Sequence, residues 1–307
     1  MKSKLAKLAA SVVLKNSLIE KGFCYFCSQP NLRKSLKLGA IALGCVQVLS
    51  YPEIRLANFK KYKMYVNIAE PLGIAAYFFQ ENRTIWLTSD LIQEGDICID
   101  AGANMGHYTL LMASKVGLTG KVISFEPQPK YFEMISKSIK LNNYNSFAFV
   151  DNRALWKLSG EKLKFYISEN PNNSGTSSLV NHGLYLNEDN SIDVVTITLS
   201  DYLQQANISK IRLIKIDVER TEVEVLEGMY GLLEANNIDF IILEMYSHSK
   251  AQEILIDFGY SCFGIDSEKR RIINIHNIEK GEFGDYLFVN PKCLPEFMEV
   301  YGQNLSE

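Results

Sequence analysis

Cysteine is scarce and scattered in this sequence. Six cysteines occur among 307 residues, and only Cys24 and Cys27 have the C-x-x-C spacing. No second pair follows to complete a zinc-binding set, so a zinc finger or zinc ribbon is not supported. The aromatic residues around this pair favour a structural role over a redox or metal role. Because nothing here calls for an oxidising compartment, we expect a cytoplasmic location.

Long hydrophobic runs are also lacking. The apolar segment Leu38 to Leu49 falls well short of the ~20 residues that span a bilayer. The basic start of the chain has an apolar run interrupted by Lys7 and Lys15, which is too short for a signal peptide. We expect residues 1–62 to form a helical extension that packs on the rest of the chain, rather than a helix on a membrane surface.

The overall charge is small, but it is unevenly distributed. The net charge is −3, yet residues 1–90 carry 13 Lys and Arg against 5 Asp and Glu, and the remainder carries 19 against 30. Pairing between the two regions is the simpler interpretation, and contact of the basic N-terminus with anionic lipid or an acidic carrier protein is the alternative. No nucleic acid is expected as a partner, because no aromatic platform motif accompanies the basic excess.

The composition is otherwise that of a globular chain. Hydrophobic residues make up 47% and charged residues 22%, which leaves enough apolar material for a core and argues against disorder. The length corresponds to one large domain or two small ones.

The most informative stretch runs from Ile97 to Lys115. Ile97, Cys98 and Ile99 form a short apolar run typical of a strand covered on both faces, and it ends at Asp100. A glycine turn and a helix start follow directly. The amides at the start of that helix carry partial positive charge, so this order predicts a cradle for a nucleotide cofactor.

The glycine pattern distinguishes between cofactors. The dinucleotide fingerprint Gly-x-Gly-x-x-Gly lacks its middle glycine here, where Asn104 stands between Gly102 and Gly106. This departure argues against an NAD-dependent oxidoreductase. An acidic residue before a looser glycine turn suits S-adenosylmethionine, which has an ammonium group and a carboxylate. Glu126 ends the next predicted strand, where such units place the carboxylate that holds ribose hydroxyls.

These residues resemble the FkbM-type S-adenosylmethionine-dependent methyltransferases. The resemblance covers about residues 91–290 and rests on six motifs: DAGANMGHYT at 100–109, FEPQP at 125–129, NRALW at 152–156, NSGTSSL at 173–179, LIKIDVERTEVEVLEG at 213–228 and IILEMY at 241–246. It implies a Rossmann-like, seven-stranded class I methyltransferase sheet over residues 63–307. The family usually has glycine where this chain has Arg220.

From Lys63 onward, short strand patterns alternate with helix patterns, which predicts an α/β fold with a mainly parallel sheet. Strands are expected at 97–100, 122–125, 146–150, 213–217 and 240–244, with antiparallel strands at 261–265, 271–275 and 286–290. Helices are expected at 107–115, 130–141, near 201–205 after an inserted hairpin, and at 222–234.

The expected cofactor residues follow the strands, since ligands of such sheets sit beyond the carboxyl ends. Asp100 would face the methionine end of the cofactor, Glu126 the ribose, and Asn152 the adenine edge, although a turn-capping role suits Asn152 equally. The remaining cofactor residues line the path of the glycine turn and helix start: Gly102, Asn104, Gly106 and His107.

Catalysis requires a group that positions the acceptor and takes its proton. Asp217 is the first candidate and Glu219 the second, because the strand pattern places both with Lys215 at the cofactor edge. His248, after the strand at 240–244, is a further candidate base. A contact of Asp217 with the cofactor, with Glu222 as an early helix acid, is the alternative. Carboxylates on this rim, Glu244 included, also suit a divalent cation, but no metal is predicted.

The function predicted from these features is S-adenosylmethionine-dependent methyl transfer. The resemblance implies a hydroxyl acceptor on a sugar, lipid or secondary metabolite. A nitrogen or carboxylate acceptor is the first alternative. A non-catalytic cofactor-binding module, in which Arg220 blocks the acceptor space, is the second. The loop at 172–178 is either a cover over the acceptor or an exposed hairpin loop.

Overall fold

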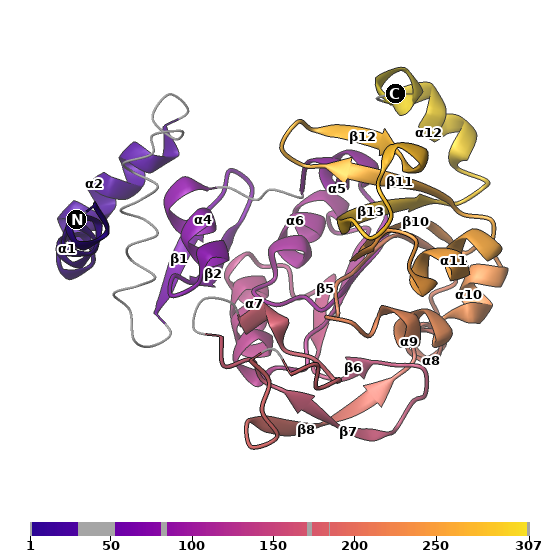
Figure 1. The fold of residues 1–307 in the computed structure, drawn as a ribbon, viewed down its shortest axis with the longest axis horizontal. Coiled ribbons are helices and arrows are strands. Elements are labelled where there is room, and N and C mark those ends of the chain that lie inside the picture. Colours follow the sequence, from indigo (N-terminus) through magenta and orange to yellow (C-terminus); the bar gives the residue numbers. More distant parts are fainter. Residues whose placement is uncertain (1, 30–52, 81–84, 171–173, 184, 306–307) are drawn as a thin grey trace.

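The fold was analysed in a computed structural model, which describes residues 2–29, 53–80, 85–170, 174–183 and 185–305. A central sheet of eight strands dominates it, with the order β12-β11-β13-β10-β9-β3-β4-β5 (Figure 1). The strands are β3 (Ile97–Ala101), β4 (Lys121–Phe125), β5 (Ala148–Asp151), β9 (Ile211–Ile216), β10 (Ile238–Tyr246), β11 (Ser261–Asp266), β12 (Arg271–Asn274) and β13 (Phe283–Val289).

This sheet confirms the expected α/β class. Strands β5, β4, β3, β9 and β10 are parallel, while β13, β11 and β12 join antiparallel at one side. All eight segments that the sequence pattern marked as strands form strands. The seven-stranded arrangement is thus extended by β12, which pairs with β11 at the edge. The parallel strands are nearly continuous in buried apolar residues, because helices cover both faces of the sheet.

The helices of this region lie on the two faces of the sheet, with α6 and α7 on one side and α8 to α11 on the other (Figure 1). Their bounds are α5 (Ile85–Leu91), α6 (His107–Val116), α7 (Pro129–Leu141), α8 (Leu199–Gln205), α9 (Glu222–Glu227), α10 (Tyr230–Glu234), α11 (Lys250–Asp257) and α12 (Leu294–Tyr301). Short 3-10 turns add η1 (Ser174–Thr176), η2 (Ile275–Asn277) and η3 (Gly302–Asn304).

The single helix expected at 222–234 is wrong, because α9 and α10 are separate. The break falls at Gly228 and Met229. A Cβ on Gly228 would lie 2.3 Å from the carbonyl oxygen of Trp156, so the chain approaches another backbone closely at this point. Such close approach is open to glycine alone, and periodicity does not reveal it.

The N-terminal region contains two helices, α1 (Lys2–Lys15) and α2 (Ser17–Ser28), followed by β1 (Ile54–Asn58), β2 (Lys63–Asn67) and α4 (Pro71–Phe79). The expectation of a helical region up to residue 62 is therefore wrong for β1, which pairs antiparallel with β2. The proposed boundary at 62/63 falls inside this hairpin. The apolar segment Leu38 to Leu49 lies outside the described residues. Across the described chain, no helix combines the length and apolar character that crossing a bilayer requires.

An insertion between β5 and β9 forms a second, three-stranded sheet. Its strands β6 (Ala154–Leu155), β7 (Lys162–Tyr166) and β8 (Ser191–Ile197) have the order β6-β8-β7. Strands β7 and β8 pair antiparallel, which confirms the expected inserted hairpin. Residues of this small sheet line the same pocket as Gly102 and Glu126, which follow β3 and β4.

Candidate functional site

The turn between β3 and α6 is built around two glycines with left-handed backbone. Gly102 has φ 79° and Gly106 has φ 87°. A Cβ on Gly102 would lie 1.8 Å from the carbonyl oxygen of Asp217, so only glycine permits this contact between the ends of β3 and β9. The amide of Asp217 also donates to the carbonyl of Ala101 at 3.0 Å. The cofactor turn and the candidate catalytic strand end are thereby held together.

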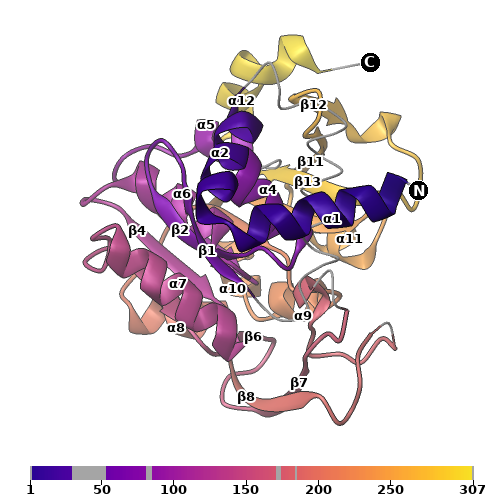
Figure 2. The ribbon, with the colours of Figure 1, turned by 90° about the vertical axis from the view of Figure 1, so that its left-hand side faces the viewer.

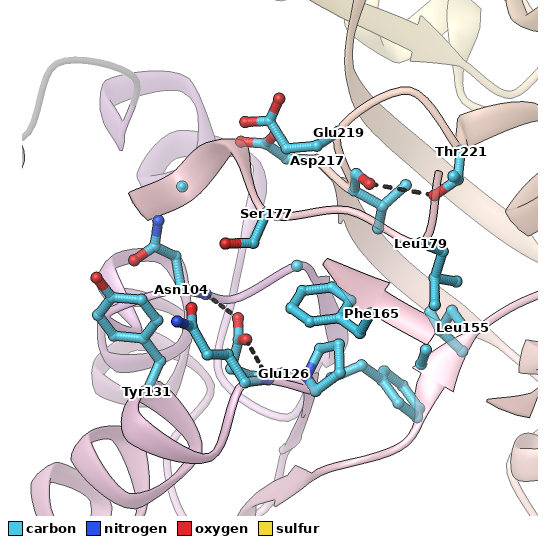
Figure 3. A pocket seen from close by; sticks show the side chains of 17 residues that line it. Asn104, Glu126, Tyr131, Leu155, Phe165, Ser177, Leu179, Asp217, Glu219 and Thr221 are labelled. Carbon is cyan, nitrogen blue, oxygen red and sulfur yellow. Dashed lines mark hydrogen bonds between the residues drawn. The ribbon is translucent and has the colours of Figure 1, made fainter. Parts of the chain in front are cut away.

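Asn104 stands where a dinucleotide fingerprint would have its middle glycine, and its side chain lines the pocket. The residue has φ 52°, a left-handed conformation that asparagine tolerates. Its Oδ1 atom is buried and has no hydrogen-bond partner among the described residues. Figure 3 shows this side chain beside Tyr131, above Glu126. A ligand that brings a donor would satisfy this oxygen.

Glu126 follows β4 and is buried at the base of the same pocket. Its carboxylate accepts from the amide of Asn104 at 2.7 Å and from the amide of Gln128 at 2.8 Å. Burial raises the pKa of Glu126 to about 8, although the two amide bonds oppose the shift. A carboxyl held in this way has lone pairs left for ligand hydroxyls.

Asp100 does not line the pocket, although the sequence pattern placed it toward the cofactor. Its side chain is buried and accepts from the Thr109 hydroxyl at 2.5 Å, and Thr109 in turn lies 2.7 Å from Ser124 Oγ. Burial raises the pKa of Asp100 to about 6. Asp100 therefore ties α6 to the start of the turn and does not contact the pocket directly.

Three further expected cofactor residues lie outside the pocket lining. Gly106 immediately precedes α6 and packs against Ile135, where a Cβ would approach to 2.9 Å. His107 is buried in the first turn of α6, and burial lowers its pKa to about 4, so it is neutral at physiological pH. Asn152 is exposed after β5. Only Gly102, Asn104 and Glu126 of the seven expected cofactor residues line the pocket.

The end of β9 carries the expected group of charged side chains. Lys215 is buried, and its Nζ lies 3.5 Å from Oδ2 of Asp217 and 3.0 Å from Oδ1 of Asp285. Burial alone would lower the pKa of Lys215, but the two carboxylates outweigh it and raise the pKa well above its usual value. The expectation that Lys215 and Asp217 share one face is confirmed. Asp217 and Glu219 both line the pocket.

Three carboxylates, those of Asp217, Glu219 and Glu244, each place an oxygen within 4.8 Å of the others. Burial, followed by the charges of Asp217 and Glu222, raises the pKa of Glu219 to about 7. The pKa of Glu244 is raised by burial and by the Asp217 carboxylate. A divalent cation could bridge this spacing, but Lys215 already supplies positive charge here. We assign no metal, and its absence stays a prediction.

Two residues singled out from the sequence lie away from the pocket. His248 is exposed after β10, and its backbone amide donates to Gln252 Oε1 at 2.7 Å. Arg220 is exposed, with φ 75°, and its backbone amide donates to Glu222 at 3.0 Å. Neither side chain is part of the pocket lining. The structure thus does not bring His248 to the carboxylates, and it turns Arg220 out to solvent.

The insertion supplies the opposite wall of the pocket. Leu155, Phe165 and Leu179 form an apolar side, while Gly175 and Ser177 come from the segment around η1. Figure 3 shows this wall facing Asn104, with Asp217 and Glu219 at one end of the pocket and Glu126 at the other. Ser178 donates its hydroxyl to the carbonyl of Glu219 at 2.6 Å. Gly175, Ser177 and Ser178 of the expected loop therefore take part in the site, and 171–173 lie outside the described residues.

Sequence reasoning missed Tyr131, Phe165 and Asp285. Tyr131 lines the pocket from α7, and Asp285 partners Lys215 from β13. The aspartate inside the otherwise apolar run of β13 was the one available signal.

The chain matches the family model described as "Methyltransferase FkbM domain" over residues 100–286. It is 26% identical over 194 residues to the hexuronic acid methyltransferase AglP of Haloferax volcanii, covering 59% of this chain and 74% of that protein. It is 28% identical over 143 residues to "Methyltransferase 1" of Beauveria bassiana, covering 43% of this chain and 57% of that protein.

Among solved structures, an O-methyltransferase from Bacillus cereus in complex with SAH matches with a TM-score of 0.35 and 13% sequence identity. The match covers 66% of this chain and 76% of that one.

Proposed function

The chain belongs to the FkbM methyltransferase family, and from this premise we propose that it transfers the methyl group of S-adenosylmethionine to a hydroxyl oxygen of a small molecule or glycan. One observation carries the proposal. Gly102, Glu126 and Asp217, which follow three neighbouring parallel strands, converge on a single pocket. That is where open α/β sheets bind their ligands.

The residues of the pocket fit the proposed methyl donor. Glu126 offers a buried carboxylate for the ribose hydroxyls, and the bare backbone at Gly102 allows close approach. The unpartnered Oδ1 of Asn104 suits the ammonium of the methionine part. The apolar wall formed by Leu155 and Phe165 suits the adenine ring.

When bound, S-adenosylmethionine supplies an electrophilic methyl group: the acceptor oxygen bonds to its carbon while the carbon–sulfur bond breaks and sulfur keeps the electron pair. The acceptor proton must go to a base. We assign this role to Glu219, because its pKa of about 7 is close to the working pH. Asp217, paired with Lys215, orients the acceptor hydroxyl.

The charge of the site favours a hydroxyl over a carboxylate acceptor. A hexuronic acid, named in the archaeal relative, carries both groups, so similarity alone leaves both open. A carboxylate acceptor is already ionised at neutral pH and needs no base. It would also be repelled by the carboxylate group at Asp217, Glu219 and Glu244. A hydroxyl acceptor instead donates its proton to that group.

A non-catalytic binding module has less support than an enzyme. It requires Arg220 to fill the acceptor space, and this residue is exposed and outside the pocket lining. An oxidoreductase is also disfavoured, since the Asn104 side chain occupies the place where a dinucleotide needs bare backbone.

Isothermal titration of the full chain with S-adenosylmethionine, and separately with NADH, tests the proposal. We expect saturable binding of the methyl donor alone, weakened at least about tenfold in Glu126→Ala, which removes the hydrogen-bond acceptor assigned to the ribose hydroxyls. Glu133→Gln is the matched control, since this glutamate lies on the exposed side of α7 with a side chain 67% exposed. Folded protein that does not bind the methyl donor would refute the proposal.

A further inference from the structure

Within the part of the chain that the structure describes, helices α1 and α2 pack on the molecule through one face. Ala10, Val13, Phe23 and Cys27 are buried on that inner face. The ring of Phe23 lies 5.1 Å from that of Phe78 in α4, in an edge-to-face arrangement. Figure 2 shows α1 and α2 in front of the rest of the chain, and Figure 1 places them at one end of the molecule.

The opposite face of these two helices exposes large apolar side chains. Six of them are exposed: Leu8 at 65%, Val12 at 50%, Leu18 at 78%, Ile19 at 43%, Tyr25 at 63% and Phe26 at 52%. Leu8 and Val12 are one helical turn apart, and Leu18 and Tyr25 are two turns apart, so each helix presents a stripe. Apolar residues clustered in this way mark a contact surface more often than scattered ones do. We call this surface the α1–α2 outer face.

Positive charge accompanies the apolar residues. Lys7, Lys15 and Lys21 are exposed on the same two helices. Glu20 is the one acidic residue in the sequence of α1 and α2, and it is buried. Its carboxylate accepts from Arg55 Nε at 2.8 Å and from the Tyr77 hydroxyl at 3.0 Å. The α1–α2 outer face therefore presents lysines and apolar groups without a carboxylate.

We propose that the α1–α2 outer face docks on an anionic membrane surface. The lysines would contact lipid headgroups while Leu18, Tyr25 and Phe26 enter the boundary with the acyl chains. Basic amphipathic helices bind membranes in this orientation, and tyrosine is favoured at the interface. A bilayer offers negative charge and an apolar layer at the same place, which matches both properties of this face.

A second copy of the chain fits this face less well. A twofold contact would bring the same face of both molecules together. Lys7, Lys15 and Lys21 would then meet a face whose two helices offer no exposed carboxylate to pair with them. An acidic protein would satisfy the lysines but would leave the exposed leucines to a polar surface. Charge complementarity combined with the apolar stripes therefore favours lipid.

Sedimentation of the full chain with vesicles tests this proposal. One set of vesicles contains phosphatidylcholine alone, and the other also contains phosphatidylglycerol. We expect binding to the anionic vesicles, weakening as salt is raised. The triple variant Lys7→Gln, Lys15→Gln and Lys21→Gln should lower the partition coefficient by at least about tenfold, since each lysine near a charged surface contributes severalfold.

The apolar contribution is tested with Leu18→Ser combined with Phe26→Ser, which should release the protein from anionic vesicles. Leu118→Ser is the matched control, because Leu118 is 79% exposed but lies after α6, outside this face. Circular dichroism verifies that each variant is folded.

Absence of sedimentation by folded protein would overturn the proposal, as would binding that both sets of variants leave unchanged. A concentration-dependent dimer in light scattering, lost in the Leu18 and Phe26 variant and accompanied by no vesicle binding, would assign the face to a second copy instead. None of these outcomes depends on methyl transfer.

Discussion

The buried ammonium of Lys215 lies 3.0 Å from Oδ1 of Asp285, and this ion pair reaches across β10, which separates β9 from β13 in the sheet. The Lys215 side chain is 3% exposed and that of Asp285 is 15% exposed. Asp217 lies 3.5 Å from the same ammonium. Asp285, in the antiparallel strand β13, thus helps to stabilise the buried positive charge of Lys215 at the end of β9.

Lys215→Met should destabilise the protein strongly. The substitution leaves Asp285 without its buried partner, and such loss costs about 3–5 kcal/mol in the free energy of unfolding. Lys215→Met combined with Asp285→Leu should cost less than the sum of the single changes, because no unpaired buried charge remains at that position. Urea denaturation of the four proteins measures this coupling. Strict additivity would show that the two side chains do not interact.

Gly102→Ala should impair both folding and cofactor binding. Its Cβ would meet the Asp217 carbonyl oxygen at 1.8 Å, so the ends of β3 and β9 must separate. Gly160→Ala is the control, since Gly160 has φ 82° and nothing within 4 Å of its Cβ position. Gly160→Ala should lower the free energy of unfolding by about 1–2 kcal/mol, because alanine is strained in a left-handed backbone conformation. Gly102→Ala should lower it clearly more, because the steric clash adds to the same strain. Equal unfolding free energies would contradict the close contact.

Glu126→Gln should change the pH dependence of stability. The pKa of Glu126 is raised from 4.5 to about 8, so the folded state resists ionisation that the unfolded chain undergoes freely. The contribution of Glu126 to the free energy of unfolding is therefore fully present below pH 4.5. It is lost as the pH rises from 4.5 through about 8, where the folded state also ionises. The glutamine variant should therefore gain stability relative to the wild type across this window. Thermal unfolding at several pH values measures the difference.

The same carboxyl should make cofactor affinity pH-dependent. Ionised Glu126 accepts two hydroxyl hydrogen bonds, whereas the protonated form has less acceptor capacity. The dissociation constant of S-adenosylmethionine should fall as pH rises toward about 8. Titration calorimetry should show this trend in the wild type and a flat profile in Glu126→Gln. A pH-dependent profile in the variant would assign the effect to another group.

Glu219→Gln should reduce turnover without a comparable loss of cofactor binding. A positioned base contributes about 10²–10⁴ in rate, so kcat should fall by that factor. The dissociation constant for S-adenosylmethionine should stay within a few-fold of the wild type. His248→Ala should leave both quantities unchanged, because this side chain is exposed outside the pocket lining. A large loss in the histidine variant would refute our assignment.

Arg220→Gly should stabilise the protein modestly. Arg220 has φ 75°, where a residue with a Cβ is strained and glycine is not, and the gain should be about 0.5–1 kcal/mol. Arg220→Ala keeps the strain while removing the guanidinium, so it separates backbone from side-chain effects. Because the side chain is exposed, neither change should lower kcat. A wild-type protein without activity that becomes active in Arg220→Gly would instead favour the alternative of a non-catalytic binding module blocked by Arg220.

The sequence patterns predict the main sheet well but its surroundings less well. Strands such as Ile97–Ala101 are apolar without interruption because both faces are covered, and that signal is local. Gly102, Asn104 and Glu126 follow such strands directly and were identified for that reason. The β1–β2 hairpin was missed, because its pairing depends on a partner strand and not on periodicity within the segment.

The errors at the site have a related cause. Asp100 begins the DAGANMGHYT motif near the end of a strand, and His248 comes two residues after the IILEMY motif. The end of a strand does not fix the direction in which the side chains there point. Asp100 turns to Thr109 in α6, and His248 adopts φ 59° and remains exposed. Tyr131 lies in α7, two residues after the FEPQP motif, and Asp285 lies in β13, outside the motifs. Their proximity to the site depends on helix packing and on β13 pairing with β10.

Tyr131 forms part of the pocket wall, yet its hydroxyl donates to Glu70 Oε1 at 2.5 Å, and Asn67 donates to the same oxygen at 2.6 Å. Asn67 and Glu70, which precede the family match, thus hold the tyrosine that lines the pocket in place. A shortened chain that began at residue 100 would retain every motif and lose the partner of this tyrosine. Transplanting the motif-bearing part into another protein would therefore require residues 53–80 to be carried with it.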